Sequence, residues 1–386
     1  MLMVREVAVS GYRSLRRIGF PVDNLSVFVG GNGTGKTNLY RGLELLQAAA
    51  RGTLTRELAA EGGMESALWA GRRRQGEAAR VRLSATLHDD GTGQDFAYAV
   101  EIGLVPQVGG VPTGAAFARE PQVKTERLSV RTGGRTAVIL EREGRTGFAR
   151  DEDGRKRSFG TDLLPTETAL GTFLDATSYP EIALVRLAMT AWRFHHAFRT
   201  DAESPLRRPC LAVTTPTLAS DGSDLAAVFA TLAHIRQDMA DLDQVLDEAF
   251  PGARLVVPAP GREASFGMTV PDFPNRVFAP PELSDGTLRY LALMGALLGY
   301  RLPPFIALNE PETSLHPDLM EPLARLIARA AQRTQIWLVT HSRRLANGIA
   351  SHGGARPRVV VKCDGETWIE GLRLSGDFAD GDDEGP

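Results

Sequence analysis

Residues 30–37 read GGNGTGKT and match the pattern G-x-x-x-x-G-K-[ST]. The apolar alternation in 25–29 predicts a strand before them, and the leucines in 39–46 lie on one stripe of a helix after them. A glycine-rich turn between strand and helix points backbone N–H groups at phosphate oxygens, and the helix N-terminus adds partial positive charge. The chain has 4 lysines against 40 arginines, so a motif that requires lysine is hard to meet by chance.

The pattern therefore predicts a loop that binds the phosphates of ATP. Lys36 would reach the β- and γ-phosphates, and the Thr37 hydroxyl would hold Mg²⁺. ATP and Mg²⁺ are the expected cofactors. The predicted nucleotide contacts in this part of the chain are Gly30, Gly31, Asn32, Gly33, Thr34, Gly35, Lys36, Thr37 and Asn38.

Three later segments predict the other half of the site. The apolar run 305–308 is typical of a buried parallel strand and ends at Asn309 and Glu310, where an open α/β sheet binds ligands. Glu310 would orient or deprotonate the attacking water, and the alternative is a polar loop with a capping glutamate. His341 ends a second buried strand and is expected to sense phosphate. Ser284 is a good N-cap for the helix that follows it.

The rest of the chain changes period along its length. Alternating apolar residues in 80–148 predict an antiparallel β-meander with one buried face. Residues 51–78 hold glycines and charges and are expected to form an irregular insertion. The expected domains are an N-terminal nucleotide-binding lobe over 1–160, a mainly helical insertion with short strands over 161–280, a C-terminal lobe over 281–375 and an acidic, disordered tail over 376–386.

Composition excludes several classes of protein. The chain is 43% hydrophobic and 24% charged, an ordinary globular balance. Its longest strongly apolar stretch, Tyr290–Tyr300, is too short to cross a bilayer, and the first residues do not resemble a secretion signal. We therefore expect a cytoplasmic protein with no membrane partner.

The net charge is −3, yet residues 1–160 hold 24 Lys and Arg against 18 Asp and Glu, so this part could present a basic face.

The order of four motifs resembles a known family. GGNGTGKT at 30–37, LSDGT at 283–287, ALNEPETSLHP at 307–317 and VTHS at 339–342 are similar to an ABC-type ATPase of the SMC/RecF-like group. The resemblance is closest to small bacterial predicted AAA-type ATPases that lack a long coiled coil. It implies an α/β fold, namely an ABC-type P-loop NTPase head with an antiparallel β-meander and a helical insertion subdomain.

The resemblance also implies a site shared by two heads. In such ATPases the signature serine and glycine of one head cap the γ-phosphate bound by the other. Ser284 and Gly286 would therefore act in trans on the nucleotide of a homodimer, while Lys36 and Thr37 act in cis. The segment 313–316 would be the D-loop at the dimer seam.

Catalytic roles follow from the same resemblance. Glu310 would be the catalytic glutamate and His341 the switch histidine, and both would act together with Lys36. Arg13 would approach the nucleotide. No glutamine of the chain can be assigned to the Q-loop of the family.

Two positions depart from the pattern of the family. The strand that usually ends in Asp-Glu ends here in Asn309, whose amide can still serve the metal but removes one negative charge beside it. We expect Thr37 and Asn309 at the metal, with weaker Mg²⁺ affinity or slower turnover. The signature reads LSDGT instead of LSGGQ, so Asp285 adds a carboxylate near the incoming γ-phosphate that Mg²⁺ or an arginine would have to offset.

Three functions stay open for this expected ATPase. The first is ATP-driven clamping of duplex DNA in repair or genome maintenance, with a nucleoid location. The positive charge of 1–160, including the basic clusters 72–74 and 155–157, supports it, although such clusters are more often solvated loop charge.

The second function is a regulatory ATPase of a bacterial defence or toxin system that gates a separate effector protein. The acidic clusters of this chain lie in polar loops and predict no nuclease site of its own. The third is a dimerisation module that binds ATP but hydrolyses it slowly or not at all, with Asn309 as the cause.

Overall fold

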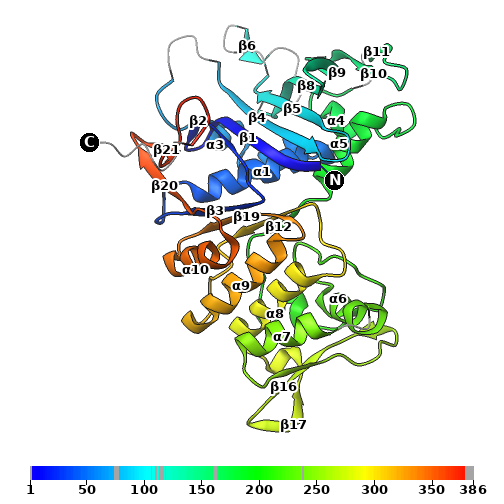
Figure 1. Ribbon diagram of the computed structural model, residues 1–386. Helices are drawn as coiled ribbons and strands as arrows, with labels where there is room; N and C mark the ends of the chain where they lie inside the picture. Colours follow the sequence, from blue (N-terminus) through cyan, green and yellow to red (C-terminus); the bar gives the residue numbers. More distant parts are fainter. Residues whose placement is uncertain are drawn as a thin grey trace. The chain divides into compact units, whose positions relative to one another are not determined.

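A computed structural model of the chain describes residues 2–73, 78–105, 107–108, 111–112, 117, 119–159, 163–236 and 239–378. The chain divides into two compact units, and both are visible in Figure 1. Unit 1 comprises Met1–Asp23, Gly30–Trp192 and Val359–Pro386, and unit 2 comprises Asn24–Val29 and Arg193–Arg358. No boundary between the units lies at 160 or 280, where the sequence predicts domain boundaries. Each unit instead combines segments that are far apart along the chain.

Unit 1 contains an eight-stranded antiparallel sheet in the order β11-β10-β9-β8-β5-β4-β1-β2. The sequence alternation that predicts a β-meander is seen in the burial of its strands, because every second residue is buried along β4 and in β5 as far as Val100. The strands are β1 (Leu2–Tyr12), β2 (Leu15–Pro21), β4 (Arg80–Asp89), β5 (Gln94–Gly103), β8 (Gln122–Thr132), β9 (Arg135–Glu143), β10 (Thr146–Arg150) and β11 (Lys156–Phe159).

Helices of unit 1 pack on this sheet. α1 begins directly after the glycine-rich loop, and a Cβ on its Gly42 would stand 2.8 Å from Val9 Cγ2, so the helix and β1 are in close contact. Two short strands, β6 (Gln107–Val108) and β7 (Val111–Pro112), pair with each other, and β20 (Arg358–Cys363) pairs antiparallel with β21 (Glu366–Ile369). The helices are α1 (Lys36–Arg51), α2 (Leu54–Ala60), α3 (Gly63–Ala67), α4 (Ala169–Thr172) and α5 (Pro180–Thr190).

The prediction of an irregular insertion over 51–78 is wrong for its first part. α2 and α3 lie within it, and Leu54, Leu58 and Met64 are fully buried. The glycines of this segment separate short helices, because Gly62 takes the left-handed conformation between α2 and α3. Residues 74–77 lie outside the described part of the chain.

Unit 2 contains four parallel strands in the order β12-β18-β19-β3. The continuous apolar runs of β18, β19 and β3 are buried along their whole length, as expected of parallel strands covered on both faces. The rings of Phe28 and Trp337 lie 5.0 Å apart across β3 and β19. The strands are β12 (Arg193–His195), β18 (Phe305–Asn309), β19 (Gln335–Thr340) and β3 (Leu25–Val29).

Helices and small sheets complete unit 2. Among the described residues no helix is both long and apolar enough to pass through a membrane. The helices are η1 (Pro205–Arg207), α6 (Leu225–Thr231), η2 (Leu232–Arg236), α7 (Ala240–Ala249), η3 (Pro280–Glu282), α8 (Asp285–Leu298), η4 (Pro317–Leu319), α9 (Met320–Ala331) and α10 (Arg343–Gly353). The short strands are β13 (Cys210–Leu211) paired with β15 (Glu263–Ala264), and β14 (Arg254–Val256), β16 (Gly267–Val270) and β17 (Phe273–Phe278) in one sheet.

The acidic tail is described only at its start. Arg373 N donates to Asp377 O at 2.8 Å, and Phe378 forms a bridge with Leu372. The rest of the tail, 379–386, for which disorder is predicted, lies outside the described residues.

A buried carboxylate ties the antiparallel sheet to α4. Glu126 on β8 is 1% exposed and accepts from Tyr98 Oη at 2.9 Å, Ala169 N at 2.6 Å and Leu170 N at 2.7 Å. Burial raises the pKa of this carboxyl, and the two backbone N–H groups oppose that rise.

Glu126→Ala is expected to lower the free energy of unfolding by about 2–4 kcal/mol, because three buried donors lose their acceptor. Glu141→Ala on β9 is the control, since that side chain is 46% exposed and should change stability by less than about 0.5 kcal/mol. Urea unfolding followed by circular dichroism measures both. Equal effects of the two variants would contradict the role given to Glu126.

Candidate functional site

The glycine-rich loop of unit 1 has the backbone that its sequence predicts. Gly33 and Gly35 have φ angles of 79° and 97°, and Gly35 is the N-cap of α1. A Cβ on Gly35 would lie 1.8 Å from Thr367 Oγ1, and a Cβ on Gly30 would lie 2.6 Å from Val360 O. Gly30 and Gly35 are therefore required by close contact with β20 and β21, and Gly35 is required by its left-handed backbone as well.

Lys36 lies folded over this loop. Its side chain donates from Nζ to Gly30 O at 2.7 Å and to Gly31 O at 2.8 Å, and the residue is 4% exposed. Thr37 is exposed on the first turn of α1. The ammonium is thus held beside the backbone that would surround a phosphate chain.

A line of hydrogen bonds fixes the loop to the neighbouring strands. Asn38 Nδ2 donates to Ser14 Oγ at 2.7 Å, and Ser14 Oγ lies 2.6 Å from Thr367 Oγ1. Thr367 Oγ1 in turn donates to Thr34 O at 2.8 Å. Ser14 and Thr367 were not among the predicted residues, because no local pattern links positions 353 residues apart.

Arg13 lies in the same unit, next to Ser14. It has a φ of 48° and donates from Nη2 to Glu61 Oε2 at 2.7 Å. It lines a hollow of about 400 Å³, together with Ser14, Trp69 and Lys362 among others. The structure therefore connects Arg13 to the glycine-rich loop through Ser14.

In unit 2, the register of the parallel strands brings the ends of β18, β19 and β3 to the same edge of the sheet. Asn309 is the register partner of Val339, and Thr340 is the partner of Val29. The chain continues from these strand ends into Glu310, into His341 and into the glycine-rich loop. Parallel pairing is therefore sufficient to start all three segments at the same edge of the sheet.

Glu310 turns sharply away from β18. Its φ is 48°, a conformation that non-glycine residues rarely adopt, and its N–H donates to Val339 O at 2.8 Å. Strained backbone of this kind concentrates at functional sites. The Glu310 side chain is 31% exposed, and its Oε1 lies 3.9 Å from Nδ1 of His341.

Glu312 holds the segment that carries His341, and the sequence reasoning missed it. This buried carboxylate accepts from the Thr340 hydroxyl, from His341 N at 3.0 Å and from Ser342 N at 3.2 Å. Its Oε1 lies 3.1 Å from His341 Nδ1. One side chain therefore fixes both the backbone and the ring of the predicted switch histidine.

Asn309 is paired with a histidine from the neighbouring strand. Its Nδ2 donates to Nδ1 of His196, the residue after β12, and Asn309 is 3% exposed. Its buried Oδ1 has no hydrogen-bond partner among the described residues. His195, which precedes His196, is neutral near pH 7 because burial lowers its pKa to about 4.

The signature segment and the D-loop lie together in unit 2. Ser284 is the N-cap of α8 and accepts from Thr287 N at 3.2 Å. A Cβ on Gly286 would lie 3.1 Å from Ser314 O. Arg289 on α8 donates to Thr313 O and, at 3.0 Å, to Phe198 O. Ser284 is exposed.

Known proteins resemble this chain in sequence over part of its length. A family model described as "AAA domain, putative AbiEii toxin, Type IV TA system" matches residues 174–347. That range includes the signature, Asn309, Glu310 and His341 and excludes the glycine-rich loop. No curated protein sequence matches the chain.

Solved structures resemble it over nearly its whole length. An SMC head bound to the C-terminal winged-helix domain of ScpA has 14% sequence identity and a TM-score of 0.56, covering 97% of this chain and 99% of that one. The SMC head from Pyrococcus furiosus has a TM-score of 0.55 at 13% identity, and the alignment covers 97% of this chain and 97% of that one. The SMC head from Pyrococcus yayanosii has a TM-score of 0.53 at 11% identity, and the alignment covers 97% of this chain and 98% of that one. The chain has the SMC-head form of the ABC-type ATPase fold, which confirms the fold class and the resemblance predicted from its motifs.

Glu312→Ala is expected to lower the free energy of unfolding by about 2–4 kcal/mol, because a buried hydroxyl and two N–H groups lose their acceptor. If His341 serves turnover, the rate of ATP hydrolysis should also fall, by about 10-fold. Urea unfolding and a phosphate-release assay measure the two effects.

Glu321→Ala on α9 is the matched control, since its side chain is 42% exposed and pairs with His352 and Arg325 at the surface. It should cost no more than about 1 kcal/mol and leave turnover unchanged. A Glu312→Ala variant as stable and as active as this control would show that Glu312 does not position His341.

Proposed function

We propose that this chain is an ATPase that binds Mg-ATP, closes head to head with a second copy and reopens after hydrolysis. The observation that carries the proposal is the common edge at which β3, β18 and β19 end. The chain continues from that edge into the glycine-rich loop, Glu310 and His341. The SMC-head fold supports the same proposal at the level of architecture.

In the proposed cis half-site, residues 30–38 bind the phosphates. Lys36 would exchange its contacts with Gly30 O and Gly31 O for oxygens of the β- and γ-phosphates. Backbone N–H groups and the N-terminus of α1 would add further donors. The hollow beside Arg13 and Ser14 leaves room for more of the nucleotide.

In the proposed trans half-site, Ser284 and Gly286 of one copy cap the γ-phosphate held by the other. The exposure of Ser284 and the contact between Gly286 and the D-loop support a surface that closes against a second chain. Glu310 would orient and deprotonate the attacking water, and His341 would contact the γ-phosphate from a position fixed by Glu312.

The residues present fit Mg²⁺. Thr37 and Asn309 are the proposed ligands. Oδ1 of Asn309, which has no hydrogen-bond partner among the described residues, is an oxygen of the type that Mg²⁺ prefers. The ion would neutralise charge that develops on the phosphate oxygens. Asn309 contributes no charge of its own, so we expect weak Mg²⁺ affinity or slow turnover.

Duplex DNA is the first candidate partner. The SMC-head fold and the positive net charge of residues 1–160 support it. The basic cluster 155–157 adds little, because Arg155 and Arg157 pair with Asp153 and Asp151 at 2.8 Å each. In the other cluster, Arg72 and Arg73 are exposed and Arg74 lies outside the described residues.

An effector protein is the second candidate partner. The family model that matches residues 174–347 carries the description of a toxin of a type IV toxin–antitoxin system, which favours a role in bacterial defence. In that role, closure of the two heads would gate a separate protein instead of enclosing DNA.

Glu310→Gln is expected to reduce the rate of ATP hydrolysis at least about 100-fold while ATP binding persists, because the amide cannot accept the proton of the attacking water. The dimer formed on ATP should then accumulate, as measured by sedimentation. Glu263→Gln on β15 is the control, since it exchanges an exposed glutamate of the same unit.

The wild-type rate is measured at several protein concentrations, with and without duplex DNA. A rate per chain that rises with protein concentration supports the shared site, and a further rise with DNA supports the first candidate partner. A rate indifferent to DNA favours the effector. ATP binding without turnover under all conditions would overturn the proposed hydrolysis.

A further inference from the structure

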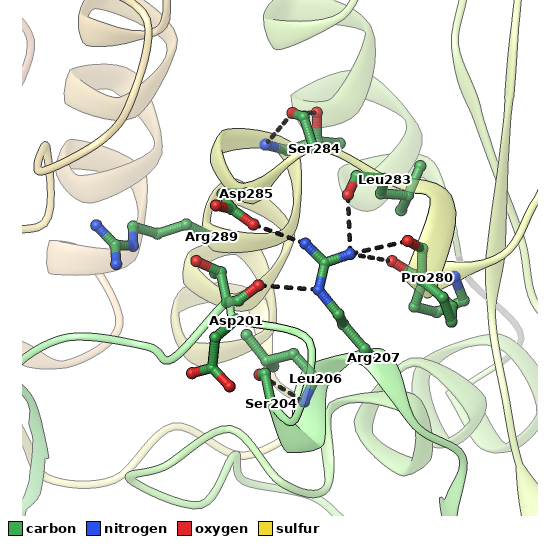
Figure 2. A network of polar contacts seen from close by, with 12 residues as sticks. Asp201, Ser204, Leu206, Arg207, Pro280, Leu283, Ser284, Asp285 and Arg289 are labelled. Carbon is green, nitrogen blue, oxygen red and sulfur yellow. Dashed lines mark hydrogen bonds and ion pairs between the residues drawn. The ribbon is translucent and has the colours of Figure 1, made fainter.

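Arg207 holds the loop that leads into the signature helix α8, as Figure 2 shows. Its Nη1 donates to the carbonyl oxygens of Pro280 at 3.0 Å, Pro281 at 3.1 Å and Leu283 at 3.0 Å. Its Nη2 donates to Oδ1 of Asp285 at 2.6 Å. One guanidinium therefore contacts four of the six residues from 280 to 285.

The guanidinium is itself held in place. Its Nε donates to Thr200 O at 2.8 Å, and the Arg207 side chain is only 13% exposed. Arg207 ends η1, whose N-cap Ser204 accepts from Leu206 N at 3.2 Å and donates to Arg199 O. A lysine could not replace this arrangement, because an ammonium lacks the planar fork that reaches a carboxylate and several carbonyls at once.

The contact with Asp285 bears on the charge at the start of α8. Asp285 is 62% exposed and lies in the first turn, where an unpaired carboxylate would offset the positive N-terminus of the helix. It would also repel a phosphate that approaches Ser284. The guanidinium of Arg207 at 2.6 Å cancels this charge locally.

A second arginine lies on α8, one turn after Asp285. Burial lowers the pKa of Arg289, and the charge of Asp285 opposes that decrease. Arg289 also binds the backbone of Thr313 and Phe198. Arg289 thus joins the signature helix to the D-loop and to the segment after β12.

We infer that Arg207 is a positioning residue of the signature segment, which it fixes through residues 280–285 while it neutralises Asp285. Ser284 and Gly286 are thereby kept ready for the γ-phosphate of an ATP bound to a second copy of the chain. The inference rests on the proposed head-to-head dimer and adds the residue that prepares its trans surface.

The test uses the full chain with Glu310→Gln, in which the ATP-bound dimer should persist. Arg207→Ala in this background is expected to raise the dimer dissociation constant at least about 10-fold, which corresponds to about 1.4 kcal/mol. Binding of a fluorescent ATP analogue by the monomer should stay within about 2-fold, because the glycine-rich loop is untouched. Sedimentation and fluorescence titration measure these quantities.

Arg208→Ala is the matched control. Arg208 is the next residue, its side chain is 58% exposed, and it pairs with Glu203, which is 74% exposed. The control should dimerise like the parent chain. If Arg207→Ala and Arg208→Ala have equal dimer dissociation constants, the inference is overturned.

Asp285→Asn separates the charge effect from simple damage to the loop. If neutralisation of Asp285 matters, Arg207→Ala should weaken the dimer at least about 10-fold in the chain that keeps Asp285. In the chain that carries Asp285→Asn, it should weaken the dimer no more than about 3-fold. Equal losses in the two backgrounds would overturn the electrostatic part of the inference.

Two further outcomes are distinguishable. If Arg207→Ala lowers the unfolding midpoint, Arg207→Lys carries the comparison, because it keeps the positive charge and loses only the planar fork. A dimer weakened by this variant to a similar extent in the parent and in the Asp285→Asn background supports the positioning role. A lysine variant that dimerises like the parent overturns it. If the parent chain itself does not dimerise with ATP, the proposed function fails, whatever Arg207 does.

Discussion

The parallel pairing of β3, β18 and β19 is the constraint on which the candidate site depends. Parallel strands end at the same edge of a sheet, so three segments that lie far apart along the chain need no direct contact to begin there. The buried apolar runs of these strands supply the stabilisation. The polar residues at their ends are then free to satisfy chemical requirements instead of packing requirements.

Several loops in each unit have no ladder of backbone hydrogen bonds, and arginine side chains bind their carbonyl groups instead. Arg207 and Arg289 in unit 2 donate to backbone carbonyls of several segments. Arg142 in unit 1 does the same with the carbonyls of Gly144, Leu164 and Glu167. A guanidinium has five N–H donors in a fixed plane, which suits it to join irregular backbone. The excess of arginine over lysine therefore has a structural use in this chain.

Sequence reasoning predicted the features that local patterns encode. The glycine-rich loop, the strands that end at Asn309 and Thr340 and the antiparallel meander all follow from spacing and alternation within short windows. It missed Glu312, His196 and Arg207, because their partners are defined only after the strands pair or the loops fold. The two helices in 51–78 were missed because each is short and bounded by glycine, which reads as a loop.

The two departures from the family pattern each have a neighbour that gives them a physical meaning. The side-chain amide nitrogen of Asn309 donates to Nδ1 of His196. The amide oxygen of Asn309 is therefore the atom that can still bind another group. Asp285 adds a charge to the signature, and Arg207 binds it. One change removes a negative charge at the end of β18, and the other adds one at the start of α8 that is already neutralised. Both arrangements are therefore compatible with the proposed binding of Mg-ATP, because Asn309 keeps an oxygen for the cation and Asp285 is paired with an arginine.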